Sequence, residues 1–258
     1  MAYQIKVTIS RITPPIWRRL RIPGNITFYQ LHRILQVAFG WLDYHLYEFD
    51  FGDVVIVEPD PEFEMAGLSK ERVELDPREA LVDQFFDKYD RCIYTYDFGD
   101  RWEHEIKIEK KLKDTKKNSV PKCIDGAGHR PPEDVGGIGG YERFLAIIKD
   151  KKHPEREEYL AWAEKDTKGR MFDSEYFYLP EINRKLLHVL EDDVDSALRL
   201  FKGRRGLSGT LKFGWYEPCV ETENGTYSWE RIGDLLTWLC DSGYTITIKV
   251  SKVRKNDI

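Results

Sequence analysis

Two copies of one seven-residue pattern carry most of the acidic chemistry that the sequence suggests. The pattern Tyr-x-[Phe/Tyr]-Asp-Phe-Gly-Asp occurs at residues 47–53 (YEFDFGD) and at residues 94–100 (YTYDFGD). Each copy places two carboxylates around one glycine, so it can hold a ligand or form a hairpin turn whose Asp side chains accept hydrogen bonds from the turn amides. The hairpin turn is the favoured interpretation of the first copy. Only the second copy continues into Trp102 and His104, which makes it the stronger candidate for a site.

Strand periodicity limits what the second copy can do. Polar and apolar residues alternate over residues 101–112, which predicts a strand with His104 on its apolar face. A histidine there is typically a core residue bonded to a backbone carbonyl or an acid, and the alternative is that it faces a ligand. Asp100 shares that face but lies roughly 13 Å away at about 3.3 Å per residue, too far to share one metal ion. A bulge or a third strand could still bring Asp97 close.

The segment 121–140 (PKCIDGAGHRPPEDVGGIGG) is predicted to be a long loop rich in proline and glycine. Its mixture of soft and hard donors suits zinc or iron, although the spacing matches no recognised metal motif. In the alternative interpretation its acids cap the next helix and its glycines allow close backbone approach. The glycine run fits no phosphate-binding pattern, and the neighbouring acids would repel an anion. The candidate donors are Cys123, Asp125, His129, Glu133 and Asp134.

The N-terminal segment is basic and the segment after it is acidic. Residues 1–40 contain six Lys or Arg residues and no acid, whereas residues 41–100 contain 17 acids and five Lys or Arg residues. Attraction between the two segments within one fold is the favoured explanation, and a basic face for an anionic partner is the alternative. In the strand predicted at residues 16–22, Arg18 points with the apolar residues and is expected to have a carboxylate partner. The opposite face combines aromatic and basic residues, as surfaces that bind single-stranded nucleic acid do. A charged edge strand would look the same. The residues concerned are Arg11, Trp17, Arg19 and Arg21.

Composition favours a soluble, cytoplasmic protein. Of the 258 residues 41% are hydrophobic and 33% are charged, and no run of 18 apolar residues that would span a membrane occurs. The N-terminus shows no apolar signal core. The four cysteines form no Cys-x-x-Cys pair, so reduced thiols are expected.

The hydrophobic pattern predicts an α+β fold with a mixed or antiparallel sheet, hairpins and a crossing helix. Thr27 is expected to cap that helix and Gly40 to end it. A helical segment should follow, at residues 141–149, from Pro154 through Trp162, and at residues 181–202. After a glycine-rich linker, strands at 210–216 and 244–250, a turn at Asn224-Gly225 and a helix at 228–240 predict a small αβ unit packed on the main domain. The predicted domains are therefore 1–203 and 204–258.

Several short motifs together resemble a plasmid-borne family named after the third open reading frame of a root-inducing Ri plasmid. The resemblance covers about residues 3 to 190 and implies an α+β domain, often encoded beside mobile elements. It implies no reaction, cofactor or catalytic residue. The matching motifs, in order, are PIWRRL (15–20), Leu31-His32, Gly40-Trp41 with His45, YDFGDxWxH (96–104), PPEDxGG (131–137), Gly140-Tyr141 and Phe172-Asp173.

Residue chemistry favours a cytoplasmic domain that binds a small ligand or a protein. A metal-dependent hydrolase or nuclease, in which carboxylates place an ion that activates water, is one alternative. A nucleic-acid-binding protein that uses the basic N-terminal strand is the other, and a kinase is excluded because no His-Arg-Asp loop or glycine-rich nucleotide loop exists. The expected ligand pocket lies between the second hairpin and the Pro/Gly segment and comprises Asp97, Asp100, Trp102, His104, Cys123, Glu133 and Asp134.

Overall fold

The computed structural model describes residues 1–58, 72–113, 115, 118–167, 169–187 and 189–190, together with the backbone of three strands within residues 210–228. The chain divides into two compact units, Met1–Leu190 and Glu191–Ile258. The division into 1–203 and 204–258 stays a prediction. None of the helices in the described ranges is long and apolar enough to cross a membrane.

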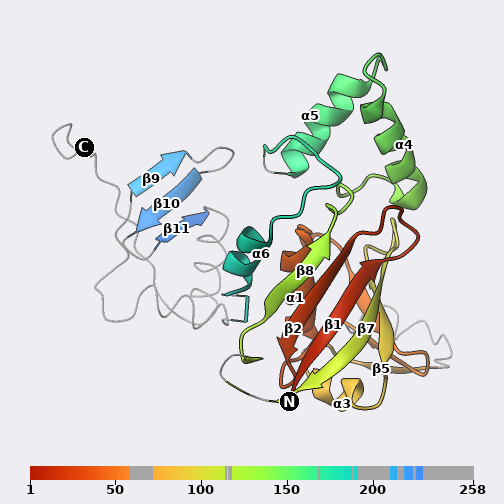
Figure 1. Cartoon of the computed structure of the whole chain (residues 1–258), viewed down its shortest axis with the longest axis vertical. Helices are drawn as coiled ribbons and strands as arrows, with labels where there is room; N and C mark the ends of the chain where they lie inside the picture. The colour runs from red at the N-terminus through yellow and green to blue at the C-terminus, as the bar shows by residue number, and fades with distance from the viewer. Residues whose placement is uncertain are drawn as a thin grey trace, which may run out of the picture. The chain divides into compact units, whose positions relative to one another are not determined.

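An eight-stranded sheet forms the larger unit and confirms the predicted α+β class (Figure 1). Its strand order is β5-β4-β3-β6-β7-β1-β2-β8, and all neighbours are antiparallel except β4 and β5. The strands are β1 (Ala2–Ile9), β2 (Trp17–Pro23), β3 (Tyr47–Asp50), β4 (Val54–Val57), β5 (Val73–Leu75), β6 (Arg91–Tyr96), β7 (Trp102–Leu112) and β8 (Lys122–Ala127).

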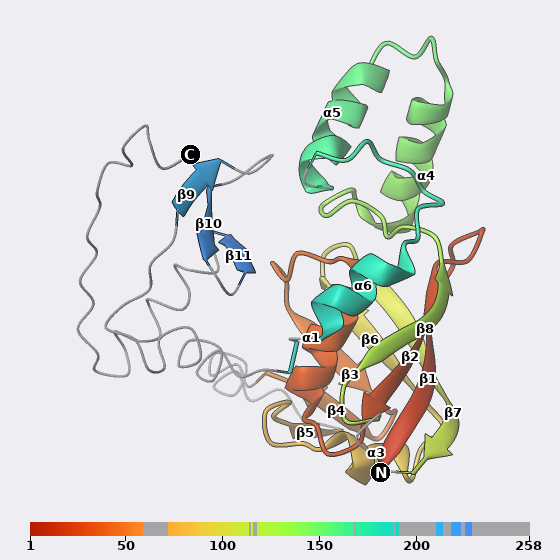
Figure 2. The same cartoon turned by 60° about the vertical axis from the view of Figure 1, so that its left-hand side comes forward.

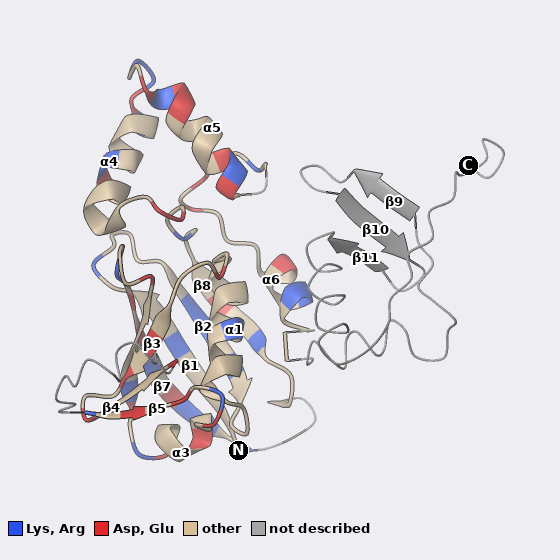
Figure 3. Cartoon of the chain, turned by 180° about the vertical axis from the view of Figure 1, so that it is seen from behind, with Lys and Arg blue, Asp and Glu red and all other residues tan. Residues whose placement is uncertain are grey.

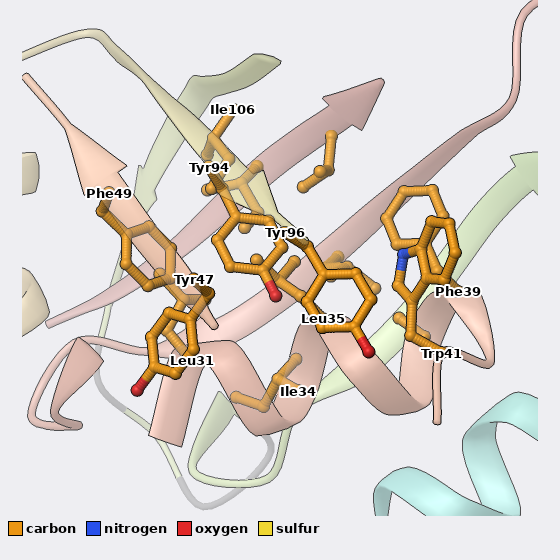
Figure 4. Close-up of a cluster of buried hydrophobic side chains, with 14 of the residues drawn as sticks. Leu31, Ile34, Leu35, Phe39, Trp41, Tyr47, Phe49, Tyr94, Tyr96 and Ile106 are labelled. Atoms are coloured by element: carbon orange, nitrogen blue, oxygen red, sulfur yellow. The ribbon is translucent and has the colours of Figure 1, made fainter. Parts of the chain in front are cut away.

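Helix α1 (Phe28–Phe39) covers one face of the sheet and buries its apolar stripe there. It begins with the predicted cap, because the Thr27 side chain accepts from the Gln30 amide and the Gln30 side chain accepts from the Thr27 amide. It ends at Gly40, whose φ of 84° is accessible to glycine without strain. Figure 4 shows Leu31, Ile34, Leu35 and Phe39 of α1 against the aromatic rings of Tyr47, Phe49, Tyr94 and Tyr96.

Further helices complete the described part of the larger unit. Helix α3 (Val82–Phe86) contributes Phe85 and Phe86, which pack edge-on against Phe28. Helices α4 (Gly137–Lys149) and α5 (Arg156–Asp166) form a pair at one end of the sheet, and α6 (Leu179–Leu186) packs against α1 and β8 (Figure 2). The predicted helix at 181–202 is confirmed only as far as α6, since its later part lies outside the described residues.

The second unit contains a three-stranded antiparallel sheet of β9 (Thr210–Phe213), β10 (Pro218–Thr222) and β11 (Gly225–Ser228), in the order β11-β10-β9. Thr222 pairs with Gly225, in agreement with the predicted turn. The helix and strand predicted at 228–240 and 244–250 lie outside the described residues.

The prediction of a continuous loop over residues 121–140 is wrong at both ends. Residues 122–127 form β8, which pairs with β2 and satisfies backbone groups that an edge strand would leave open. Only glycine fits at position 126 of this strand, because a Cβ there would meet the Phe177 ring at 2.7 Å and the Trp17 carbonyl oxygen at 2.8 Å. At the other end, Gly137–Gly140 form the first turn of α4. The expectation that β2 could be an edge strand is also wrong, since it lies between β1 and β8.

Arg18 has no carboxylate partner among the described residues, contrary to expectation. Its guanidinium is buried and donates to the carbonyls of Ala38 at 2.8 Å and of Trp17, Ala127 and Gly128 at 2.9 Å. The Ala38 carbonyl belongs to the last turn of α1, where carbonyls lack intrahelical donors and carry the negative end of the helix dipole. Arg18 therefore joins α1 to the β2–β8 edge of the sheet.

His104 is the core histidine that strand parity predicted. Its ring is fully buried, its Nδ1 lies 2.8 Å from the Trp102 carbonyl, and its Nε2 lies 3.2 Å from Trp41 Nε1. The Trp41 indole can only donate, so Nε2 accepts and Nδ1 carries the proton. The imidazole is therefore neutral, and burial lowers its pKa to about 4.

This buried imidazole predicts that the protein loses stability in mild acid. As the pH falls, the histidine of the unfolded state, with a pKa of about 6.5, binds a proton at a higher pH than His104 does in the folded state. The stabilisation of the folded state by neutral His104 is therefore complete above about pH 6.5 and lost towards pH 4. Between pH 7 and pH 5 we expect His104 to lower the free energy of unfolding by about 2 kcal/mol. Urea unfolding at both pH values measures this, and His104→Gln should show a smaller loss. Equal pH sensitivity of the two proteins would contradict the assignment.

Candidate functional site

The turn between β6 and β7 presents Asp97 as a buried carboxylate. Asp97 has a φ of 60°, and its Oδ1 accepts hydrogen bonds from the amides of Gly99 at 2.9 Å and Asp100 at 3.2 Å. This is the hairpin turn that the heptad predicted. The second oxygen, Oδ2, points away from the turn and lies 3.7 Å from Nε2 of His45.

His45 lies on the loop between α1 and β3, and several side chains hold that loop in place. The Leu42 amide donates to Glu133 Oε1 at 2.7 Å, the Asp43 amide donates to the Gln36 side chain, and the Tyr44 amide donates to the Tyr96 hydroxyl. His32 also bonds Asp43 at 2.7 Å. The His45 ring packs edge-on against Tyr96, which fixes its position beside the β6–β7 turn.

Glu133 and Asp134 come from the loop before α4. Arg130 anchors this loop by donating to the carbonyls of Gly40 and Pro131 and by pairing with Asp166 at 2.9 Å. The Glu133 amide donates to Asp166, so both ends of this short segment are fixed. Glu133 is 5% exposed and Asp134 is exposed to solvent.

Three carboxylates thus surround one imidazole. His45 Nε2 lies 3.3 Å from Asp134 Oδ1, 3.7 Å from Asp97 Oδ2 and 3.8 Å from Glu133 Oε2. One donor atom each of His45, Asp97 and Asp134 lies within 4.8 Å of the others, close to the separation of donors around a single ion. We call His45, Asp97, Glu133 and Asp134 the His45 cluster.

Two buried atoms of the His45 cluster have no hydrogen-bond partner within the part of the chain that the structure describes. They are Nε2 of His45 and Oε2 of Glu133. Buried polar atoms in native proteins are nearly always bonded to protein, water or an ion, so each exception calls for an explanation. Burial raises the pKa of Glu133, while the Arg130 guanidinium and the Leu42 amide act in the opposite direction.

Backbone strain is concentrated at the same place. Asp43, Asp97 and Asp134 have φ values of 63°, 60° and 54°, in the left-handed region that few residues other than glycine adopt. One of them lies on each of the three segments that form the site. Strained residues persist where the surroundings determine them, and they are frequent at binding sites.

The structure brings together only part of the predicted pocket. Asp97, Glu133 and Asp134 meet in the His45 cluster, and Asp100 lies beside it, where its Oδ2 accepts from the Gly136 amide at 3.0 Å. Trp102 and His104 instead point into the core beneath α1, as the parity of β7 requires. Cys123 is buried on β8, where its amide donates to Asn183 and its thiol to the Asp125 carbonyl.

Residue type and spacing alone do not identify His45 as a candidate ligand. It appeared in the sequence only as part of the family-like motif Gly40-Trp41 with His45. Its position follows from the pairing of β3 with β6, in which Tyr47 lies opposite Tyr96 and the Asp97 amide donates to the Leu46 carbonyl. The two heptads are therefore paired with each other, which the duplication hints at but does not specify.

The first heptad forms a hairpin turn in which both acids have protein partners. Asp50 accepts from the Gly52 amide at 2.6 Å and pairs with Arg72 at 2.8 Å. Asp53 accepts from the Tyr89 hydroxyl at 2.9 Å. This arrangement confirms the structural interpretation of the first copy.

Acids of β7 compensate much of the positive charge on β2 and in the loop before it. Arg19 pairs with Glu109 at 2.8 Å, and Arg11 pairs with Glu103 at 3.5 Å. Lys6 and Arg19 also lie over the Trp17 ring, at 4.9 Å and 5.1 Å from its centroid. Arg21 is half-buried, and its Nε has no partner in the described ranges. Nucleic-acid binding through this face stays a prediction.

Two known proteins resemble this chain over much of its length. An uncharacterized protein from Sinorhizobium fredii, y4hQ, is 38% identical over 159 residues, which cover 62% of this chain and 79% of the relative. The crystal structure of a protein of unknown function from Methanosarcina mazei Go1, MM3350, superposes with a TM-score of 0.59 at 34% identity. That match covers 70% of this chain and 96% of the other.

The family comparison agrees with the motifs found in the sequence. Residues 1–181 match the protein family described as "Plasmid pRiA4b ORF-3-like protein". This range contains the eight-stranded sheet, the hairpin of the second heptad and all members of the His45 cluster. Because the match extends over well more than half of the sequence, the chain belongs to the plasmid pRiA4b ORF-3-like protein family.

Proposed function

We propose that the Met1–Leu190 unit is a divalent-metal-binding domain whose ligands are His45, Asp97 and Asp134, with Glu133 as a fourth donor or as the acceptor for a metal-bound water. The observation that carries this proposal is the pair of buried, unbonded atoms, His45 Nε2 and Glu133 Oε2, which face each other at 3.8 Å. An ion between them would bond both atoms and offset the repulsion among three carboxylates.

The donor set suggests which ions fit best. One imidazole with two or three carboxylates suits Mn²⁺, Fe²⁺, Co²⁺ or Zn²⁺, whereas Mg²⁺ and Ca²⁺ prefer sites made of oxygen alone. The competing explanation is an imidazolium that pairs with the carboxylates without any metal. That explanation leaves the Nε2 proton without a hydrogen bond, since no carboxylate in the described chain meets the geometry of one.

Metal addition to the full chain tests the proposal. After chelation and dialysis, we expect about one Mn²⁺ or Zn²⁺ per chain by elemental analysis. At a free metal concentration of about 100 times Kd, bound metal should raise the free energy of unfolding by about 2.7 kcal/mol. For a unit of this size that corresponds to roughly 5–10 °C in melting temperature, and Mg²⁺ should give a much smaller shift. The proposal would be refuted if the chain bound no metal and its melting temperature did not change on metal addition.

Metal-dependent hydrolysis is a second candidate, and the exposure of Asp134 favours it. The Asp134 side chain is 71% exposed, so the solvent side of a bound ion would have room for a water molecule. A divalent ion lowers the pKa of such a water and so generates a nucleophile. Turnover of phosphodiester and carboxylic ester probes with Mn²⁺ bound tests this candidate. Stoichiometric metal without turnover would leave a binding domain only.

We propose a cytoplasmic location, in which unpaired thiols are the expected state. Cys92 and Cys123 are both free and buried. Burial raises the pKa of the Cys123 thiol to about 11, so this thiol is inert at neutral pH.

A further inference from the structure

A second candidate site lies beneath α6, and it shares no side chain with the His45 cluster. A cavity of about 410 Å³ is bounded by the end of α1, residues 129–130, residues 166–178 and α6. Ligand pockets for small organic molecules have volumes of this order. Figure 2 shows α6 lying across α1 and β8, and the last turn of α1 contributes to the floor of this cavity.

Positive charge dominates the lining of this α6 cavity. Five cations and two carboxylates line it, which gives 5 − 2 = +3. The two carboxylates already have partners, since Asp166 pairs with Arg130 at 2.9 Å and Glu181 pairs with Lys185 at 2.8 Å. Figure 3 marks Lys and Arg positions on α6 in blue. Among the described residues no carboxylate forms an ion pair with Arg18, Arg170 or Arg184.

Arg18 contributes a cation that is already desolvated. Its side chain is 2% exposed, and its five N–H groups make four hydrogen bonds to carbonyls, which leaves one N–H without a described acceptor. Burial lowers the pKa of Arg18 to about 10, so the guanidinium stays charged at neutral pH. A charge buried without a counterion is costly, and an anion in the cavity would reduce that cost.

Arg170 and the aromatic residues complete the lining. The Arg170 guanidinium lies 3.6 Å from the centroid of the Tyr176 ring, and its Nη1 is buried without a hydrogen-bond partner in the described ranges. The central carbon of the Arg18 guanidinium lies 5.0 Å from the centroid of the Phe39 ring and 4.9 Å from that of the Phe177 ring. Planar groups stack favourably on guanidinium and aromatic faces, whereas their charged substituents bond to arginine N–H groups.

We propose that the α6 cavity binds a small organic anion that carries a planar ring, with its phosphate or carboxylate held by Arg18 and Arg170 and with Arg184 at the entrance. This site does not depend on the metal proposal, because the two sets of side chains are different. The anion should bind more weakly as ionic strength rises, since exposed Arg184 contributes to its attraction.

Isothermal titration of the full chain tests this inference with a nucleoside monophosphate, benzoate, inorganic phosphate and the uncharged nucleoside. We expect the monophosphate or benzoate to bind with a Kd below about 1 mM, and the nucleoside to bind at least about 10-fold more weakly. The two charged ring probes distinguish a phosphate from a carboxylate head group. No heat of binding from any anionic probe up to about 5 mM would overturn the proposal.

Two arginine variants keep the test specific. Arg170→Gln and Arg184→Gln should each weaken binding by at least about 10-fold, because each removes a charge-assisted hydrogen bond or a nearby cation. Neither arginine pairs with a described carboxylate, so both variants should melt near the wild-type temperature. Arg143→Gln, which changes an exposed arginine on α4, is the matched control and should bind like the wild type. Unchanged affinity in both pocket variants would contradict the site.

Discussion

Replacing Asp97 by asparagine should lower the affinity of the protein for Mn²⁺ by at least about 100-fold, because this change removes a charged ligand. At metal sites, even the loss of a residue that only supports a ligand typically lowers metal affinity by roughly 10–100-fold. Asparagine keeps the Oδ1 atom that accepts from Gly99 and Asp100, and it tolerates the φ of 60°. The turn should therefore survive, and only the charge near His45 is lost.

The duplicated heptad provides the matched control for this variant. Asp50 occupies the equivalent position in the first copy, and its Oδ1 accepts from the Gly52 amide in the same way. Asp50→Asn should leave metal affinity unchanged, although it weakens the exposed ion pair with Arg72. Both affinities are measured by titration with Mn²⁺. Equal affinities of the two variants would show that Asp97 does not bind the ion.

The metal-free proteins give a second distinction. Without an ion, Asp97 contributes to repulsion within the His45 cluster, so Asp97→Asn should melt at or above the wild-type temperature. The metal-induced rise in melting temperature should then vanish in this variant. A metal-free melting temperature well below that of the wild type would instead mean that the carboxylate is needed for folding.

Alanine at position 140 should destabilise the protein by at least about 3 kcal/mol, whereas alanine at position 139 should stabilise it by about 0.5–1 kcal/mol. A Cβ atom on Gly140 would overlap the carbonyl oxygen of Val135, and backbone cannot move aside as a flexible side chain can. Gly139 lies one residue earlier on α4, is exposed and has open space around it, so alanine there only restricts the unfolded chain.

This pair of variants also connects the fold to the site. Gly140 lies close to the backbone of Val135, directly after Asp134, and Gly137 lies against the Asp100 carbonyl, where a Cβ would be at 2.8 Å. These close approaches place the loop before α4 against the β6–β7 turn. Urea unfolding measures the two free energies, and Gly140→Ala should also weaken Mn²⁺ binding. Similar stability of both variants would contradict the close packing.

Local patterns predicted most of the sheet and its central helix. Alternation in residues 101–112 identified β7 and placed His104 inward, and Thr27 and Gly40 marked the ends of α1, because these signals depend on neighbouring residues. The composition of the Pro/Gly segment does not reveal β8, because this strand forms only by pairing with β2, more than 100 residues earlier in the chain. The partner of Arg18 was missed for a similar reason, since a helix end supplies its acceptors.

The candidate site was predicted in part. The carboxylates of Asp97, Glu133 and Asp134 were named from their residue types and their unusual loops. His45 was not selected, because its distance from Asp97 depends on the long-range pairing of β3 with β6. The residue types of Cys123 and Trp102 suggest a site, but the path of β8 and the strand parity of β7 place both side chains in the interior.

Crystallography with anomalous scattering from Mn²⁺ or Zn²⁺ tests the metal site most directly. The account predicts one strong anomalous peak about 2.0–2.3 Å from His45 Nε2, Asp97 Oδ2 and Asp134 Oδ1, with Glu133 either bound or one water away. Metal-soaked crystals with no peak among these atoms, and with a hydrogen bond from the His45 ring to one of the carboxylates, would contradict it.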